Sequence, residues 1–545
     1  MTRLKRMLLT CGLMLALPAP LAAQVADGAT PVPRIESSNG RHALMVDGAP
    51  YLVLGAQVNN SSNYASALAQ VWPTIERMNA NTVEVPIAWQ QIEPAEGQFD
   101  FTFLQTLLEQ ARRHDKRLVI LWFGTWKNTG PSYLPDWVKL NNTRFPRMKK
   151  RDGSDHYVHS PHARATLDAD KAAFVRLMTY LRDHDPQNTV ILVQPENEVG
   201  SYGNPRDYGT EANRLFAQAV PAELTAAVKK PAGTWTQVFG TGADRAFNSW
   251  YTARYVGEIA AAGKAVKPTP MYVNASLYDP FSPINANNLA SGGPQQDVID
   301  IWKAAAPAID FAAPDIYDRR SRAVFAYLDG YKRHDNPLMV PEIGNAPEYA
   351  RYFWATLGRG AIGFAPFGMD DTGYHNYPLG GVLDEPTLEA FAMKYRVFGG
   401  MAREWARIAY ERPTWGAARP DDDAPVKTVM GDWAITASWG EWQFGSKDST
   451  WLKGDAPAWR GKPMGGAIVA QLSPNEFLFT GDFVRMSFAG RDGGPKNATI
   501  VRVEEGRMVD GKWVMDRVWN GDQTDYGINL IDRPVWLKVT MGNYR

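Results

Sequence analysis

Residues 189–203 read TVILVQPENEVGSYG, an apolar run that changes abruptly into a cluster of polar residues and glycines. The run TVILV is apolar on both faces after its first residue, which is typical of a parallel strand buried on both sides. The segment RLVILWF at 117–123 has the same character. A helical pattern at 168–184 separates the two runs, so this region is predicted to be a βα repeat.

The alternation of short strand and helix continues on both sides of this region. Eight strand candidates follow one another, at 51–57, 81–89, 117–123, 189–193, 271–275, 311–315, 338–340 and 361–366. Eight βα units over about 350 residues predict a (β/α)8 TIM barrel with insertions. An open, doubly wound sheet is the alternative, but it requires a glycine-rich phosphate loop after an early strand, and the sequence has none.

The sequence pattern changes after a long helical stretch at 387–411. Residues 413–427, PTWGAARPDDDAPVK, are rich in turn-forming residues and predict a linker. Beyond it, segments such as WAITASW and KWVMDRVW alternate between apolar and polar residues with a period of two. We therefore expect a catalytic barrel at 35–412 and an all-β, sandwich-like domain at 428–545.

The amino-terminal segment predicts the cellular location. Its first 23 residues, MTRLKRMLLTCGLMLALPAPLAA, combine a basic start, a short apolar run and small residues at the end. This order predicts a signal peptide at 1–23, too short to span a membrane, and a secreted or bacterial periplasmic protein. Acylation at Cys11, the only cysteine, is a weaker alternative. The chain has 58 basic and 58 acidic residues, which argues against a nucleic-acid partner.

Two glutamates follow predicted strands at positions suited to catalysis. Catalytic groups of a (β/α)8 barrel lie just beyond the carboxyl ends of its strands. Glu198 follows the fourth predicted strand, and Glu342 follows the seventh, in PLMVPEIGN. A single glutamate after a strand is usually an ordinary polar residue, but two that face each other fit glycoside hydrolysis. One protonates the leaving oxygen, and the other attacks the anomeric carbon or activates a water molecule.

Two segments resemble glycoside hydrolase family 35, the β-galactosidases of the retaining (β/α)8 clan. QPENEVGSYG is similar to that family's Asn-Glu signature, and NTVEVPIAWQQIEPAEGQFDF at 81–101 is similar to its second-strand segment. The resemblance covers roughly residues 35–400. It implies that Glu198 is the general acid/base, Glu342 the nucleophile and Asn197 a ligand of the sugar 2-hydroxyl.

The same resemblance implies the reaction and its substrate. It implies retaining removal of terminal β-D-galactose from oligosaccharides, such as galactosylated xyloglucan side chains. The third-strand segment FGTWKNTGPSYLPDWVK departs from the family pattern, which leaves the sugar open. A β-glucosidase or another retaining glycosidase is one alternative. A non-catalytic carbohydrate-binding protein is a second, but it would not need both acids.

Other strand ends supply candidates for substrate binding. Tyr317 is a candidate hydrogen-bond donor to Glu342, and Asn274 and Glu84 are candidates for binding a sugar hydroxyl. Trp126 is a candidate for stacking on a sugar ring, although abundant tryptophan is also typical of a rich core. The structural interpretations of these residues are core packing for the tryptophan and capping of a neighbouring loop for Glu84.

Three histidines, His156, His159 and His162, are spaced three residues apart in a polar loop. No cysteine or strand pattern frames them, so metal binding is not expected. No cofactor is predicted. The expected partner is an oligosaccharide or polysaccharide, and the formation of a homodimer is left open.

Overall fold

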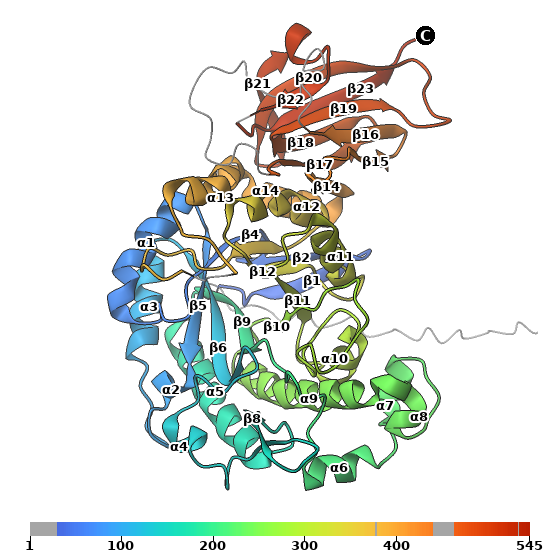
Figure 1. Ribbon diagram of the computed structural model, residues 1–545. Helices are drawn as coiled ribbons and strands as arrows, with labels where there is room; N and C mark the ends of the chain where they lie inside the picture. Colours follow the sequence, from blue (N-terminus) through green and yellow to red (C-terminus); the bar gives the residue numbers. More distant parts are fainter. Residues whose placement is uncertain (1–29, 376–378, 440–462, 532) are drawn as a thin grey trace, which may run out of the picture.

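The computed structural model describes residues 30–375, 379–439, 463–531 and 533–545. The predicted signal peptide at 1–23 lies outside the described residues. Within the described part of the chain, the structure has no helix with both the length and the apolar character needed to cross a membrane. A barrel and a β domain follow one another along the chain (Figure 1).

Eight parallel strands form the barrel that the sequence predicts. Their order is β10-β11-β12-β13-β4-β5-β6-β9, and a parallel bridge between Val193 and Met271 joins the first and last strands. The strands are β4 (Val53–Gln57), β5 (Thr82–Ala88), β6 (Arg117–Lys127), β9 (Val190–Asn197), β10 (Tyr272–Ser276), β11 (Phe311–Ile316), β12 (Met339–Ile343) and β13 (Gly363–Pro366). The predicted (β/α)8 fold is confirmed.

Helices surround the barrel and connect its strands (Figure 1). The main ones are α1 (Ala65–Met78), α3 (Thr102–Arg113), α5 (Arg164–His184), α9 (Ala243–Val266), α10 (Ile299–Ala305), α11 (Ser321–Tyr331), α12 (Tyr352–Gly358), α13 (Glu385–Phe398) and α14 (Ala402–Glu411). Shorter elements extend the connections between them: α2 (Trp89–Ile92), α4 (Asp136–Lys139), β7 (Arg147–Lys149), β8 (Asp155–His159), α6 (Thr210–Phe216), α7 (Ala222–Ala227) and α8 (Trp235–Phe239). The stretch expected as one helix at 387–411 is two helices, because Gly399 and Gly400 separate α13 from α14.

The side chains of each barrel strand point alternately inward and outward. On β6, Val119 and Leu121 belong to the cluster inside the barrel, whereas Leu118 and Ile120 pack in the larger cluster with the helices. Leu44 and Val46 join the inner cluster. They lie on the antiparallel sheet of β1 (Arg34–Ser38), β2 (Arg41–Val46) and β3 (Ala49–Tyr51), which therefore packs against the barrel interior.

The carboxyl-terminal unit consists of two antiparallel sheets around a common apolar core. One sheet contains β14 (Thr414–Ala418), β17 (Gly466–Ser473), β18 (Glu476–Asp482), β23 (Leu537–Asn543), β20 (Ala498–Val509) and β21 (Lys512–Trp519). The other contains β15 (Val426–Met430), β16 (Trp433–Ser438), β19 (Val484–Gly490) and β22 (Ile528–Leu530). The predicted β domain is confirmed as a fold.

Strand β14 falls within the segment expected to be a linker at 413–427. It packs against α12 through its backbone rather than through large apolar side chains. A Cβ atom added at Gly416 would lie 2.2 Å from the Trp354 carbonyl oxygen, and one added at Gly358 would lie 2.1 Å from the Gly416 nitrogen. Because the contact uses glycine, the strand lacks the apolar signal by which a sequence pattern reveals it.

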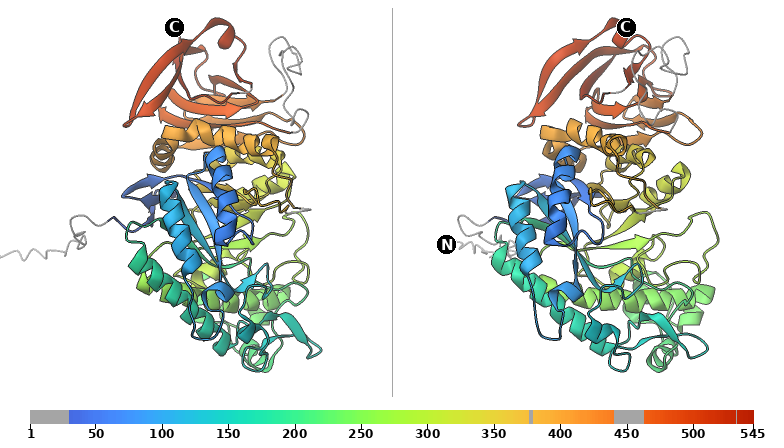
Figure 2. Two further views of the ribbon diagram at one scale, coloured as in Figure 1. Left: turned by 90° about the vertical axis from the view of Figure 1, so that its left-hand side faces the viewer. Right: turned by 60° about the vertical axis from the view of Figure 1, so that its left-hand side comes forward.

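Helices α12, α13 and α14 lie between the barrel and the β domain (Figure 2). At this junction Lys394 and Asp482 form an ion pair in which both side chains are fully buried. The other Asp482 oxygen accepts a hydrogen bond of 2.6 Å from Trp354 Nε1. The two units thus share a buried polar contact as well as apolar packing.

Candidate active site

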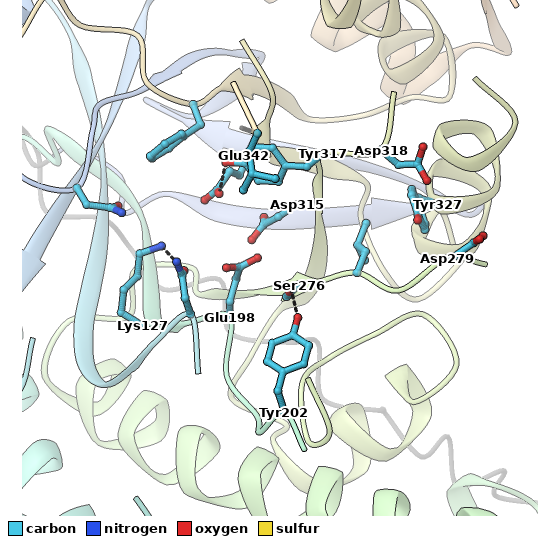
Figure 3. Close-up of a pocket in the computed structure, with 15 residues that line it drawn as sticks. Lys127, Glu198, Tyr202, Ser276, Asp279, Asp315, Tyr317, Asp318, Tyr327 and Glu342 are labelled. Carbon is cyan, nitrogen blue, oxygen red and sulfur yellow. Dashed lines mark hydrogen bonds between the residues drawn. The ribbon is translucent and has the colours of Figure 1, made fainter. Parts of the chain in front are cut away.

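A cavity of ≈ 450 Å³ lies where the carboxyl ends of the barrel strands meet. Its lining includes Lys127 from β6, Glu198 from the segment after β9, Asp315 from β11 and Glu342 from β12 (Figure 3). Tyr317, just after β11, also lines it. The two predicted catalytic glutamates therefore reach one cavity from the fourth and seventh barrel strands, as the strand count predicts.

The chain leaves β9 through two residues with positive φ, 64° at Glu196 and 43° at Glu198. This conformation is uncommon for a residue other than glycine and costs about 1–3 kcal/mol, so its surroundings must hold it. The Glu198 N–H donates to Asn274 Oδ1 at 2.9 Å, and the Glu198 carbonyl accepts from the Thr129 N–H at 3.0 Å. These bonds fix the turn that presents the Glu198 carboxyl group to the cavity.

Glu342 receives a hydrogen bond on each carboxyl oxygen. Gln57 Nε2 donates to Oε2 at 3.0 Å, and the Tyr317 hydroxyl donates to Oε1 at 2.6 Å. Burial, followed by the charge of Glu342, raises the pKa of Tyr317 well above its usual value, so this phenol remains a donor. The two donors fix the orientation of the Glu342 carboxyl group, as the attack of a nucleophile requires.

Glu198 has the opposite environment. Burial, followed by the negative charge of Glu342, raises the pKa of Glu198 to about 7, against the lowering effect of Lys127. A carboxyl group that keeps its proton near neutral pH can donate it to a leaving group. Of the two glutamates, Glu198 is therefore the one suited to donate a proton.

A third carboxyl group, Asp315, lies between Glu198 and Glu342 (Figure 3). Asn274 Nδ2 donates to Asp315 Oδ2 at 2.6 Å, so the same amide side chain that holds the Glu198 backbone also holds this acid. Burial, followed by the charges of Glu342 and Glu198, raises the pKa of Asp315 well above its usual value. The rise favours the protonated form of this carboxyl group.

Lys127 and Asn197 form a polar pair at the ends of neighbouring strands. Lys127 Nζ donates to Asn197 Oδ1 at 2.9 Å and to Asn128 Oδ1 at 2.6 Å. Asn197 is 1% exposed, and its Nδ2 has no hydrogen-bond acceptor among the described residues. This amide therefore retains donor capacity beside the catalytic acids, where a substrate hydroxyl could use it.

Of the five predicted binding residues, Tyr317 lines the cavity, whereas Asn197, Asn274, Glu84 and Trp126 are not among its lining residues. Glu84 on β5 is fully buried in the barrel, where it accepts a hydrogen bond of 3.2 Å from the Tyr272 hydroxyl. Trp126 is 1% exposed, and its ring packs edge-to-face on Tyr255 with centroids 4.6 Å apart. Strand β6 continues to Lys127, and the Trp126 ring packs against α9 outside the barrel.

Three residues around the acids were not predicted from the sequence. Gln57 and Asp315 lie at the carboxyl ends of predicted strands, so the rule that selected Glu198 could also have found them. Lys127 could not be found in this way, because the expected strand ends at Phe123, whereas β6 extends to Lys127.

The three closely spaced histidines have separate surroundings. His156 Nε2 lies 3.0 Å from the Tyr202 carbonyl oxygen, whereas the His162 ring stands against Tyr251 at a centroid distance of 4.7 Å. Burial lowers the pKa of His159 to about 3. Across the described ranges, no group of three or more histidine, cysteine or acidic side chains is arranged to hold a metal ion.

Two unlike carboxyl groups that face one cavity at the mouth of a (β/α)8 barrel are the arrangement that glycoside hydrolysis uses. Residues 65–265 match the glycoside hydrolase family 42 model, which is described as beta-galactosidase. The match includes Glu198 and ends before Glu342. Residues 391–531 match a domain of unknown function, DUF5597. The expected membership of family 35 is therefore wrong.

Comparison with individual proteins gives more distant similarities. A beta-galactosidase from Xanthomonas manihotis is 24% identical over 182 residues, which are 32% of this chain and 28% of that relative. The chain thus matches less than a third of that relative's length. The beta-galactosidase structure from Bacillus circulans sp. alkalophilus is 12% identical, with 65% of this chain and 57% of that chain covered and a TM-score of 0.46. The beta-galactosidase structure from the psychrophilic Marinomonas ef1 is also 12% identical. The similarity covers 66% of this chain and 62% of that chain, with a TM-score of 0.48.

Proposed function

We propose that this protein is a retaining exo-glycoside hydrolase that removes terminal β-D-galactose from oligosaccharides. The observation that carries the proposal is the contrast between its two glutamates. Glu342 accepts two hydrogen bonds, whereas burial and a neighbouring negative charge raise the pKa of Glu198 to about 7. The match of residues 65–265 to a beta-galactosidase family supports the choice of sugar.

In the first step, Glu342 attacks the anomeric carbon while Glu198 gives its proton to the leaving glycosidic oxygen. This step forms a glycosyl ester on Glu342 and removes that residue's negative charge. Since this charge is one cause of the raised pKa of Glu198, its loss lowers that pKa and favours the carboxylate. Glu198 then takes a proton from water, which attacks the anomeric carbon and releases Glu342.

The walls of the cavity offer both donors and acceptors to a sugar. We expect Lys127 and Asp315, which line the cavity, and Asn197, which is hydrogen-bonded to Lys127, to bind hydroxyl groups. Asn197 Nδ2 and Asp315 Oδ1 have no hydrogen-bond partner among the described residues. Galactosylated xyloglucan oligosaccharides are the natural substrate to test first. β-Glucosides are the competing substrates, because they differ only in the orientation of the 4-hydroxyl group.

The test is a comparison of E342A, E198A and the exposed control E96A on nitrophenyl β-galactoside. Each catalytic variant should lose at least about 10³-fold in kcat, whereas E96A should retain turnover. Azide should restore E342A and give the α-galactosyl azide, and it should restore E198A and give the β-anomer. Turnover near the wild-type value in either catalytic variant, or a preference for the β-glucoside, would contradict the corresponding part of the proposal.

We further propose that the protein is exported, since residues 1–23 have the order of a signal peptide. The mature protein should then begin near Ala23 or Gln24. Amino-terminal sequencing of protein from the periplasmic and culture fractions measures this directly. An intact Met1 in the active protein would contradict export by cleavage.

A further inference from the structure

The pairing of strands β6 and β9 shifts register at two places, and the second of these lies next to the cavity. Their pairing runs to Trp122 and Pro195 and resumes at Lys127 and Asn197. In this gap β6 has residues 123–126, whereas β9 has only Glu196. The bulge decides where Lys127 and the segment leading to Glu198 lie, because both follow it directly.

Two acidic side chains provide the hydrogen-bond acceptors that the strand pairing lacks in this bulge. The Trp126 N–H donates to Glu196 Oε2 at 2.7 Å, and the Thr125 N–H donates to Asp170 Oδ2 at 3.0 Å. Asp170, from α5, also accepts from Trp122 Nε1 at 2.9 Å and from Thr125 Oγ1 at 2.6 Å. Three donors to Asp170 favour its charged form.

The remaining oxygen of Glu196 faces Asp170. A Cβ atom added at Gly124 would lie 2.6 Å from Glu196 Oε1 and 2.8 Å from Asp170 Oδ1, so both oxygens face the same small space beside this glycine. Glu196 Oε1 is buried and has no hydrogen-bond donor among the described residues. Two oxygens that only accept hydrogen bonds repel each other, whereas a proton on one of them turns the contact into a strong hydrogen bond.

The surroundings of the pair also favour one shared proton. Burial is the largest cause that raises the pKa of Glu196, and the charge of Asp170 follows. Burial also raises the pKa of Asp170. From α9, the Tyr255 hydroxyl lies 2.8 Å from Thr125 Oγ1, and burial raises its pKa well above the usual tyrosine value, so it stays neutral beside the pair.

We infer that protonated Glu196 and ionised Asp170 form a positioning pair that holds the β6 bulge and thereby places Lys127 and Glu198 at the cavity. Glu196 donates its proton to Asp170 and accepts from the backbone, and Asp170 accepts from three groups of β6. The positioning role rests on the proposed function. The shared proton does not, because it concerns folding and pH alone.

The two members of the pair should respond differently to replacement by an amide. In E196Q the amide nitrogen replaces the protonated oxygen and donates to Asp170, while the amide oxygen still accepts from Trp126. In D170N one oxygen of Asp170 is replaced by an NH2 group, which would then face the N–H and O–H groups that donate hydrogen bonds to Asp170. We expect E196Q to fold and to keep kcat within about threefold, and D170N to lose at least about tenfold in kcat with a lower Tm.

Glu93 provides the matched control, because it is also a buried glutamate. Its two oxygens accept from Trp89 Nε1 and from the Gly97 N–H, each at 2.8 Å, so its carboxyl group is not a donor. We therefore expect E93Q to lower Tm, unlike E196Q. If E196Q lowers Tm as much as E93Q does, Glu196 is an acceptor only and the inference is wrong.

Measurement of Tm against pH separates the shared proton from a purely structural role. The raised pKa of Glu196 gives stability that is present below the unfolded value near 4.5 and is lost as pH rises through the folded value. E196Q does not lose stability in this way. The Tm of E196Q should therefore rise relative to the Tm of the wild type as pH rises from 5 towards 9. A Tm difference that does not change with pH would overturn the shared proton even if both proteins hydrolyse galactosides. Failure of the catalytic test in "Proposed function" would leave this result unaffected.

Discussion

The alkaline limb of the pH–activity profile should report the proton on Glu198. With a pKa of about 7 for this group in the free enzyme, about 90% of the molecules carry the proton at pH 6 and about 10% at pH 8. We therefore expect kcat/KM for a nitrophenyl galactoside to fall about tenfold between these pH values.

Replacement of Lys127 by methionine tests the physical cause of this limb. The ammonium group lowers the pKa of Glu198, so its removal should move the alkaline limb to higher pH. The assay measures kcat/KM from pH 5 to 9 with two aryl galactosides. One has a poor leaving group, which needs the proton, and the other has a dinitrophenyl leaving group, which does not.

Two results would refute the reasoning on Glu198. The first is an alkaline limb of equal depth for both leaving groups, since a limb that is independent of proton donation cannot arise from the acid. The second is a limb in K127M that moves to lower pH, which would reverse the sign of the electrostatic effect. The exposed variant K512M, on strand β21, should leave the limb unchanged and controls for overall charge.

Two further predictions concern contacts described above. Y317F removes the hydroxyl that donates a hydrogen bond to Glu342. The loss of such a bond, about 1.5–3 kcal/mol, should lower kcat/KM at least about tenfold in steady-state assays. An unchanged kcat/KM would show that Gln57 alone orients the carboxylate. K394M leaves Asp482 buried without its partner, and should lower the free energy of unfolding by about 3–5 kcal/mol in denaturant titrations. If K394M lowers the free energy of unfolding as little as K512M does, the buried ion pair is contradicted.

The barrel could be predicted because its strands are buried on both faces and therefore read as continuous apolar runs. RLVILWF and TVILV are strands in the structure, and strand order places Glu198 and Glu342 at one cavity. Strand β14 could not be predicted in this way, because its contact with α12 uses glycine and backbone atoms.

The details of the site were less predictable than its position. The sequence does not reveal that β6 extends beyond Phe123, and this extension puts Lys127 at the cavity and Trp126 among the helices. The family expected from short motifs was wrong, because such motifs describe a strand end and its acids, which related barrels can share. The match over residues 65–265 uses the spacing of many more positions.

The buried ion pair between Lys394 and Asp482 also bears on how such a two-domain chain can evolve. In this pair, a buried charge of one domain is neutralised by a buried charge of the other. A truncation that removes the β domain leaves Lys394 and Trp354 without their carboxylate partner, so the barrel cannot be inherited alone without compensating substitutions. Loss of either domain in a single genetic step is therefore disfavoured, even though the residues that line the cavity all belong to the barrel unit.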